Sequence, residues 1–293
     1  MTPAALHALI SNTRDDVIEL PAGRFDFGAL VNVRFNPGTV VRGSGRDLTT
    51  LACGFAGDYR PGCAFELHDG VVLENLRLEA NGPVDKQSML VGFARDDAPH
   101  QALATVRGCS LVGRGFVVYH WNGSLRTTIN VDDCEIEGGR WLMCCGNSSG
   151  PDAAFVNVQR CTLRGRPDLS TYQGAVGRRL MGFCCRGGRL RAQNCLVELD
   201  GTAKSEGARV DEVRGAWTDD AAGGGSQWAV LESLDCHYRL TAGGAKTCFD
   251  LDQQLGEIRC CGGSGSGPRG AWWARGNVDI MTPLPRRTVG VSG

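Results

Sequence analysis

The sequence predicts an all-β chain folded as a right-handed parallel β-helix, a solenoid of stacked coils with a short N-terminal capping helix. Three observations lead to this prediction. A short apolar pattern recurs along the chain, cysteine replaces leucine at one position of it, and glycine is abundant, at 42 of 293 residues. Glycine suits the tight turns that join many short strands, and it follows no three-residue period here, which excludes collagen.

The recurring pattern reads apolar, two variable residues, apolar or cysteine, one variable residue, apolar. Its copies begin 24 to 39 residues apart, and they are Leu73-Leu76-Leu78, Val106-Cys109-Leu111, Val131-Cys134-Ile136, Val158-Cys161-Leu163, Ala192-Cys195-Val197, Leu231-Leu234-Cys236 and Leu255-Ile258-Cys260. Apolar residues that alternate with polar ones predict half-buried strands whose apolar side chains point inward. One coil cannot bury its own apolar face, so the coils must stack.

A second apolar strand is expected after several of these motifs, at 115–121, 139–145, 179–185 and 246–252. A leucine-rich repeat is the main alternative, because LENLRLEAN (73–81) matches its consensus. That repeat is regular, at about 20–29 residues, and carries a helical segment in each unit. The variable spacing and the β-rich connections of this chain favour the β-helix.

The chain contains 14 cysteines, for which there are three explanations. A disulfide framework is typical of small secreted chains, and a zinc site needs paired thiols at CxxC spacing, which the sequence lacks. Cysteine is also among the most buried residue types and can serve as a small core side chain. The place of cysteine in the repeat favours this third explanation, which predicts synthesis in a reducing compartment.

The pattern divides the chain into three segments. Residues 1–16 are expected to hold a helix from Pro3 to Ile10, with Thr2 as N-cap, that covers the open end of the solenoid. Residues 17–262 are expected to form the β-helix. Residues 263–293 are expected to form a turn-rich tail or a C-terminal cap.

Residues 17–51 carry a more specific signal. It comprises the turn Leu20-Pro21-Ala22-Gly23, then Phe25, then Val40-Val41-Arg42-Gly43-Ser44-Gly45, Asp47, Thr49, Thr50 and Leu51. This arrangement resembles the opening coil of the pectate-lyase-like (pectin-lyase-fold) superfamily of right-handed β-helices, which includes phage tailspikes. The resemblance implies a polysaccharide partner and, for the tailspike type, a homotrimer. Of the NTD, DD, GHG and RIK motifs of the related polygalacturonases only DD is present, so no catalytic residue carries over.

Composition argues against several partners. The formal net charge of −1 gives no support for nucleic acid, and no apolar stretch approaches the roughly 20 residues that span a bilayer. The first residues show neither the basic nor the long apolar region of a secretory signal. We therefore expect no nucleic-acid or membrane partner. We expect synthesis in a reducing cytoplasm, with release as part of a virion if the chain is a phage appendage subunit.

One candidate site surrounds Asp219 and Asp220, which lie in a glycine-rich segment between Trp217 and Trp228. Tryptophan can stack on a sugar ring while two carboxylates act on the glycosidic bond. We therefore name the two aspartates as candidate catalytic residues and the two tryptophans as candidate substrate-binding residues. A solvated surface loop is the alternative.

A second pair of candidate catalytic residues is Asp250 and Asp252. They share the outer face of a strand if Phe249 and Leu251 face inward, and such a pair suits acid–base catalysis or a Ca²⁺ site. An ordinary exposed strand face is the alternative. No other cofactor or metal is expected.

His120 and Trp121 complete the candidate substrate-binding residues. They belong to a polar and aromatic cluster, Tyr119 to Asn122, at an expected corner of a coil. A histidine there can act as a general acid, and a purely structural role is the alternative.

Three functions remain open from the sequence. The first is a polysaccharide lyase or glycoside hydrolase that cleaves a surface polysaccharide. The second is a non-catalytic glycan-binding or adhesive module, such as a phage appendage subunit. The third is a structural solenoid that presents a partner-binding face. The second and third differ from the first in needing no catalytic carboxylates.

Overall fold

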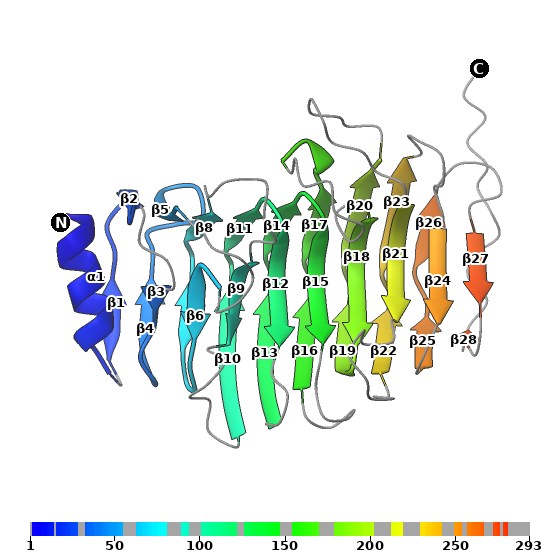
Figure 1. Ribbon diagram of the computed structural model, residues 1–293, viewed down its shortest axis with the longest axis horizontal. Helices are drawn as coiled ribbons and strands as arrows, with labels where there is room; N and C mark the ends of the chain where they lie inside the picture. The colour runs from blue at the N-terminus through cyan, green and yellow to red at the C-terminus, as the bar shows by residue number, and fades with distance from the viewer. Residues whose placement is uncertain are drawn as a thin grey trace.

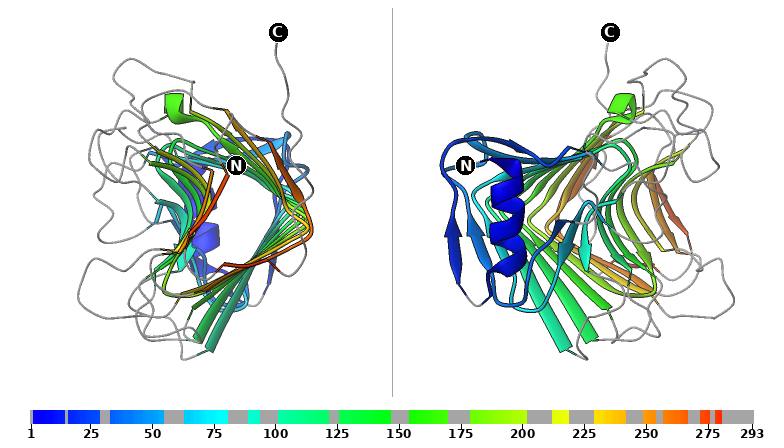
Figure 2. Two further views of the ribbon diagram at one scale, coloured as in Figure 1. Left: turned by 90° about the vertical axis from the view of Figure 1, so that its right-hand side faces the viewer. Right: turned by 60° about the vertical axis from the view of Figure 1, so that its left-hand side comes forward.

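The chain forms three parallel β-sheets that run the length of the molecule (Figure 1). The computed structural model describes residues 2–14, 16–28, 33–54, 63–80, 89–93, 101–121, 126–146, 154–169, 179–201, 212–218, 229–241, 249–253, 257–266, 272–275 and 278–280. Viewed end-on, the three sheets are the walls of a tube whose interior holds the core (Figure 2). The predicted fold class, a right-handed parallel β-helix with an N-terminal helix, is confirmed.

Each coil contributes one strand to each sheet in the same order. Sheet A contains β1 (Val17–Glu19), β4 (Val40–Arg42), β7 (Val72–Glu74), β10 (Gln101–Arg107), β13 (Arg126–Asp132), β16 (Ala154–Gln159), β19 (Gly188–Gln193), β22 (Ala229–Leu234), β25 (Glu257–Cys261) and β28 (Val278–Ile280). Sheet B contains β2 (Gly23–Asp26), β5 (Thr49–Cys53), β8 (Arg77–Ala80), β11 (Ser110–Gly113), β14 (Glu135–Gly138), β17 (Thr162–Gly165), β20 (Leu196–Asp200), β23 (His237–Thr241) and β26 (Ser264–Ser266). Sheet C contains β3 (Val33–Arg34), β6 (Phe65–Leu67), β9 (Met89–Phe93), β12 (Phe116–Trp121), β15 (Trp141–Gly146), β18 (Arg179–Arg186), β21 (Glu212–Thr218), β24 (Phe249–Gln253) and β27 (Trp272–Arg275). A short 3₁₀ helix, η1 (Pro167–Leu169), follows β17. The predicted second strands correspond to β12, β15, β18 and β24.

The turn from sheet A to sheet B explains the recurring motif. Its first residue has a positive φ, between 50° and 64°, in seven coils: Asn75, Gly108, Asp133, Arg160, Asn194, Asp235 and Gly262. Asn, Asp and Gly tolerate this left-handed conformation best, which makes Arg160 the exception. The next residue points into the core, and in five coils it is a cysteine: Cys109, Cys134, Cys161, Cys195 and Cys236.

The cysteines are core residues, as predicted. All 13 cysteines in the described part of the chain are free thiols, and 12 of them are buried. At the turn, the thiol donates a hydrogen bond to a nearby carbonyl, as from Cys161 Sγ to Gln159 O at 3.0 Å. A small side chain therefore fills this corner and adds a weak hydrogen bond to a carbonyl that already accepts a backbone N–H.

The last two predicted motifs have the wrong register. Leu231 lies opposite Leu190 and Ser233 opposite Ala192, so the motif in this coil is Ser233-Cys236-Tyr238. Leu234 is half-buried, on the other side of the strand from the buried Ser233. The same register makes the following motif Cys260-Gly263-Gly265, because Cys260 lies opposite Ser233 and Gly265 opposite Tyr238. Alternating apolar residues on both faces of β22 caused the error.

Helix α1 (Pro3–Asn12) covers the N-terminal end of the tube, as predicted (Figures 1 and 2). Thr2 is its N-cap and accepts a hydrogen bond from Ala5 N at 3.2 Å, while Leu6 and Ile10 are buried against the first coil. At the other end, β26, β27 and β28 extend all three sheets beyond the boundary expected at residue 262. In the described residues, no helix is long and apolar enough to cross a membrane.

Candidate functional site

The structure places most of the predicted site residues on or beside sheet C. His120 and Trp121 lie on β12, Trp217 on β21, and Asp250 and Asp252 on β24. Asp252 lies directly opposite Trp217 on the neighbouring strand, so these two are brought together. β12 and β21 are separated by β15 and β18.

Several of these predictions fall outside the described part of the chain. This applies to Asp219, Asp220 and Trp228, and to the side chains of Trp121, Asp250 and Asp252. Their catalytic and substrate-binding roles, and the Ca²⁺ site at Asp250 and Asp252, stay predictions. Among the described residues, no cluster of three His, Cys, Asp or Glu side chains could hold a metal ion.

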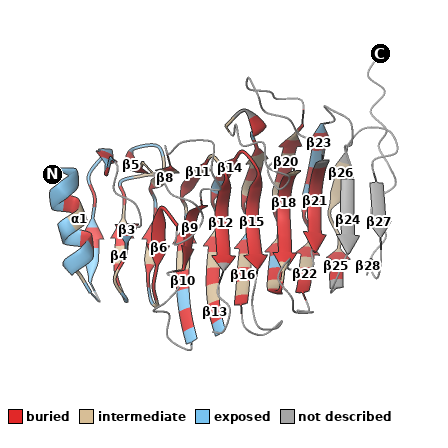
Figure 3. Ribbon diagram, in the orientation of Figure 1, coloured by how far each residue is buried: buried red, intermediate tan, exposed pale blue. Residues whose placement is uncertain are grey.

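Trp217 lies within a second apolar layer, on the outside of sheet C. Its side chain is only 3% exposed, and its ring meets that of Trp141 edge-on, with centroids 6.2 Å apart. The layer comprises Cys63, Met89, Phe116, Tyr119, Trp141, Cys144, Met181, Cys184 and Trp217. Figure 3 shows β12, β15, β18 and β21 buried along most of their length. The ring of Trp217 is therefore packed inside this layer rather than exposed for stacking on a sugar.

His120 is a core residue in this structure. It is fully buried, and its Nε2 lies 2.6 Å from Thr127 Oγ1, with the Phe93 ring 5.5 Å away. Burial lowers the pKa of His120 to about 4, although a hydrogen bond with the Thr127 backbone opposes the shift. The imidazole is thus neutral near pH 7. The substrate-binding role of His120 stays a prediction. In this structure the ring has no exposed face with which to contact a ligand.

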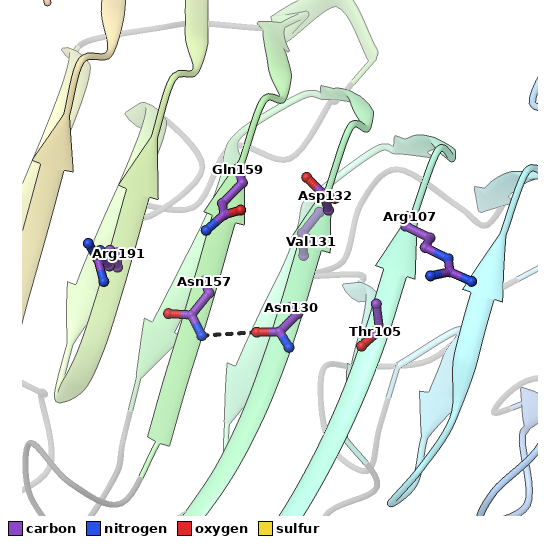
Figure 4. A pocket seen from close by; sticks show the side chains of 8 residues that line it. All are labelled: Thr105, Arg107, Asn130, Val131, Asp132, Asn157, Gln159 and Arg191. Atoms are coloured by element: carbon purple, nitrogen blue, oxygen red, sulfur yellow. Dashed lines mark hydrogen bonds between the residues drawn. The ribbon is translucent and has the colours of Figure 1, made fainter.

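A groove of about 370 Å³ lies elsewhere, on the outer face of sheet A (Figure 4). Four neighbouring strands, β10, β13, β16 and β19, supply its walls. The lining residues are Thr105, Arg107, Asn130, Val131, Asp132, Asn157, Gln159 and Arg191.

The groove arises from side-chain length. Thr105, Asn130, Asn157 and Arg191 occupy one row across the sheet, because each lies opposite the next on its neighbouring strand. The short side chains of this row leave a depression, which Arg191 bounds on β19 and Arg107, from the neighbouring row, bounds on β10. The row faces outward, because on each strand the residues directly before and after the row member are buried.

Two stacked asparagines form the floor of the groove. Asn157 Nδ2 donates a hydrogen bond to Asn130 Oδ1 at 2.9 Å, as the dashed line in Figure 4 marks. This bond leaves Asn130 Nδ2 as a donor and Asn157 Oδ1 as an acceptor, and Gln159 adds a third amide beside them. The floor therefore offers both donors and acceptors, and they are separated by the distance between adjacent strands, about 4.8 Å.

The charged residues at the rim are engaged in ion pairs. Arg107 Nε and Arg42 Nε both donate to Glu74, at 2.6 Å each. Burial alone would raise the pKa of Glu74, but these arginines outweigh it and hold the pKa below its usual value. Asp132 Oδ2 pairs with Arg160, and its Oδ1 is a buried acceptor with no hydrogen-bond partner in the described part of the chain.

The groove is better suited to binding than to hydrolysis. Glycosidases use two carboxylates across the scissile bond, whereas Asp132 is the one carboxylate among the eight lining residues and is already paired. A row of amides and hydroxyls instead matches a ligand that carries many hydroxyl groups.

The sequence-based reasoning did not single out these residues. A usable signal exists: when coils are aligned on the positive-φ turn residue, Asn130 and Asn157 occupy the same position. Two stacked asparagines in neighbouring coils would have indicated an amide ladder.

Comparison with known proteins shows a shared fold. No protein-family model matches the sequence, and no curated protein matches it. Among solved structures, a pectin methylesterase from Erwinia chrysanthemi superposes with a TM-score of 0.54 and 14% identity, covering 95% of this chain and 88% of the other. A pectin methylesterase in complex with hexasaccharide VII gives a TM-score of 0.54 and 13% identity, with the same coverage. The A-module of a mannuronan C-5 epimerase from Azotobacter vinelandii is also similar, with a TM-score of 0.37, 12% identity, and coverage of 96% and 92%.

The three all-parallel sheets and these similarities define the class of this molecule. It is a right-handed parallel β-helix of the pectin-lyase-like fold, as the resemblance of residues 17–51 implied. The fold is shared by proteins with different chemistry, so function has to be argued from the groove.

Proposed function

We propose that this chain is a glycan-directed β-helix protein that binds a polysaccharide in the sheet A groove. The observation that carries the proposal is the amide ladder of Asn130 and Asn157 in a groove of about 370 Å³. Sugar hydroxyls both donate and accept hydrogen bonds, and the floor of the groove offers both.

The direction of the groove supports a polymeric ligand. It crosses four strands along the tube, so equivalent positions recur from coil to coil. A polymer of similar units can make the same contact several times on such a surface. The two pectin methylesterases of similar fold are named for action on a polysaccharide, and one was solved with a hexasaccharide.

Binding without cleavage is the activity that the groove supports best, because its single carboxylate is ion-paired. Cleavage by Asp219, Asp220, Asp250 or Asp252 is the alternative proposal. It predicts that a polysaccharide bound by the chain is also shortened, and that Asp252→Asn abolishes the shortening. If no reducing ends or unsaturated uronates appear during incubation, the alternative is rejected.

A finer proposal concerns assembly. We propose a homotrimeric appendage subunit of the tailspike type, made in a reducing compartment, and the 13 free cysteines of the described residues support the second part. Light scattering should then give three times the chain mass of 31.3 kDa. A monomer at all concentrations would rule out the trimer but leave the binding proposal intact.

Binding is tested with the intact chain and a panel of purified polysaccharides, using calorimetry or affinity electrophoresis. The double variant Asn130→Ala/Asn157→Ala should weaken binding about five- to 150-fold, because two lost hydrogen bonds at about 0.5–1.5 kcal/mol each together cost about 1–3 kcal/mol. Gln101→Ala is the matched control, since Gln101 is an exposed amide of the same sheet that does not line the groove. Binding to no member of the panel, or equal binding by the double variant, would refute the proposal.

A further inference from the structure

We infer that the sheet A groove selects neutral sugar units over acidic ones such as uronates; this rests on the proposed polysaccharide binding. The observations behind it are the directions in which the charged rim residues point and the chemistry of the floor. Figure 4 shows the rim and floor residues together.

Both rim arginines reach away from the groove, and the rim aspartate is engaged by a neighbouring arginine. Arg107 Nε contacts Glu74 on β7, which lies on the side of β10 opposite to the groove. Arg191 Nε faces Glu232 on β22, again away from the groove, at 4.0 Å. Asp132 Oδ2 turns to Arg160 at the A–B turn.

The rim arginines also have anionic partners before any ligand arrives. Glu74 is shared by Arg107 and Arg42, and Glu232 by Arg191 and Arg259, at 4.0 and 3.3 Å. A uronate carboxylate would lose its water and would then compete with these glutamates for the same guanidinium groups. Desolvating a carboxylate costs several kcal/mol unless a new partner compensates for it.

The floor itself is uncharged and matches neutral groups. Thr105, Asn130, Asn157 and Gln159 offer donors and acceptors together. A hydroxyl or an acetamido group uses both, whereas a carboxylate only accepts hydrogen bonds. Acceptors such as Asn157 Oδ1 would therefore repel a carboxylate that approached the floor.

Two other arginines on this face would be the binding partners of an acidic polymer. Arg126 and Arg189 lie on the same face as the groove but do not line it, and neither forms an ion pair with a described residue. The guanidinium of Arg189 lies over the Phe155 ring, 5.9 Å from its centroid. An acidic polymer would bind these two arginines, so they distinguish the two ligand classes.

The test compares each uronate-containing polysaccharide of the panel with its carboxyl-reduced form. The sugar backbone is the same in both forms, but in the reduced form every carboxylate has become a primary alcohol. The neutral form should bind at least about tenfold more tightly. Its affinity should be the same in about 0.05 M and about 0.5 M NaCl, because screening affects only charge–charge attraction. Arg126→Gln/Arg189→Gln should leave this affinity unchanged.

Three outcomes are distinguishable. Tighter binding of the neutral form with no salt dependence supports the inference. Tighter binding of the acidic form, lost in high salt or in Arg126→Gln/Arg189→Gln, overturns the inference while the proposed function stands. Absence of binding to either form of every polymer overturns both.

Discussion

At the scale of single residues, cysteine has one repeated task in this fold. It follows the positive-φ residue of the A–B turn, where the space is small and a carbonyl group lies within reach of the thiol. Cys134 Sγ, for example, lies 3.2 Å from Asp132 O and 3.5 Å from Val106 O. Burial raises the pKa of buried cysteines elsewhere in the core, to about 12 for Cys53 and Cys260. Such thiols stay protonated and are poor nucleophiles, as expected of structural cysteines.

Removing one of these thiols should destabilise the fold. Cys161→Ala leaves a small cavity and removes the thiol hydrogen bond to Gln159 O, which still accepts from Asp133 N, and we expect it to lower the free energy of unfolding by about 1–2 kcal/mol. Cys261→Ala, at a half-buried cysteine, should change it by less than about 0.5 kcal/mol. Urea denaturation measures both, and equal effects would contradict the core role of the turn cysteines.

His120 should make stability depend on pH. Its pKa is about 4 in the fold and about 6.5 when unfolded, so the unfolded chain binds the extra proton between these values. Stability is therefore full above about pH 6.5 and falls as the pH is lowered toward 4, by up to about 3 kcal/mol. Denaturation of the wild type and of His120→Asn at several pH values isolates this contribution. A constant difference between the two proteins from pH 7 to pH 4 would contradict it.

At the scale of strands and helices, the informative unit is the row of residues that crosses a sheet. One row of sheet A changes from Val17, Val40 and Val72 to the groove residues and then to the charged Glu232 and Arg259. The motif itself was predictable from local alternation. The groove was not, because it depends on which residues of different coils share a row. The motif places Asn130 and Asn157 in one row, but the apolar pattern does not reveal that the polar side chains of neighbouring coils leave a groove between them.

Helix α1 should protect the first coil. Leu6 and Ile10 are fully buried, whereas Leu9 on the same helix is 39% exposed. Leu6→Ala should cost about 2–5 kcal/mol and should promote self-association, because uncovering a strand edge lets it pair with other chains. Leu9→Ala is the control and should do neither. Chemical denaturation and light scattering measure the two effects, and matching behaviour of both variants would contradict the capping role.

At the scale of the whole molecule, the three outer faces differ in chemistry. Sheet C carries a buried apolar and aromatic layer, and sheet A carries the polar groove. Sheet B carries ion pairs between coils, such as those of Arg164 and Arg239 with Glu198, at 3.3 and 2.9 Å. The sequence predicted the inside of the tube well, because core residues follow a local pattern. The outer faces were harder to predict, because Trp217, expected at a binding surface, packs in the second apolar layer instead, and the groove depends on residues from four different coils.

The most direct test of the account is an experimental structure of the chain with a bound oligosaccharide taken from the best-binding polysaccharide. Sugar units are expected in the sheet A groove, with hydroxyl groups within hydrogen-bond distance of Asn130 and Asn157. Sugar bound instead along sheet C, beside Trp217 and Asp252, with the groove unused, would contradict it.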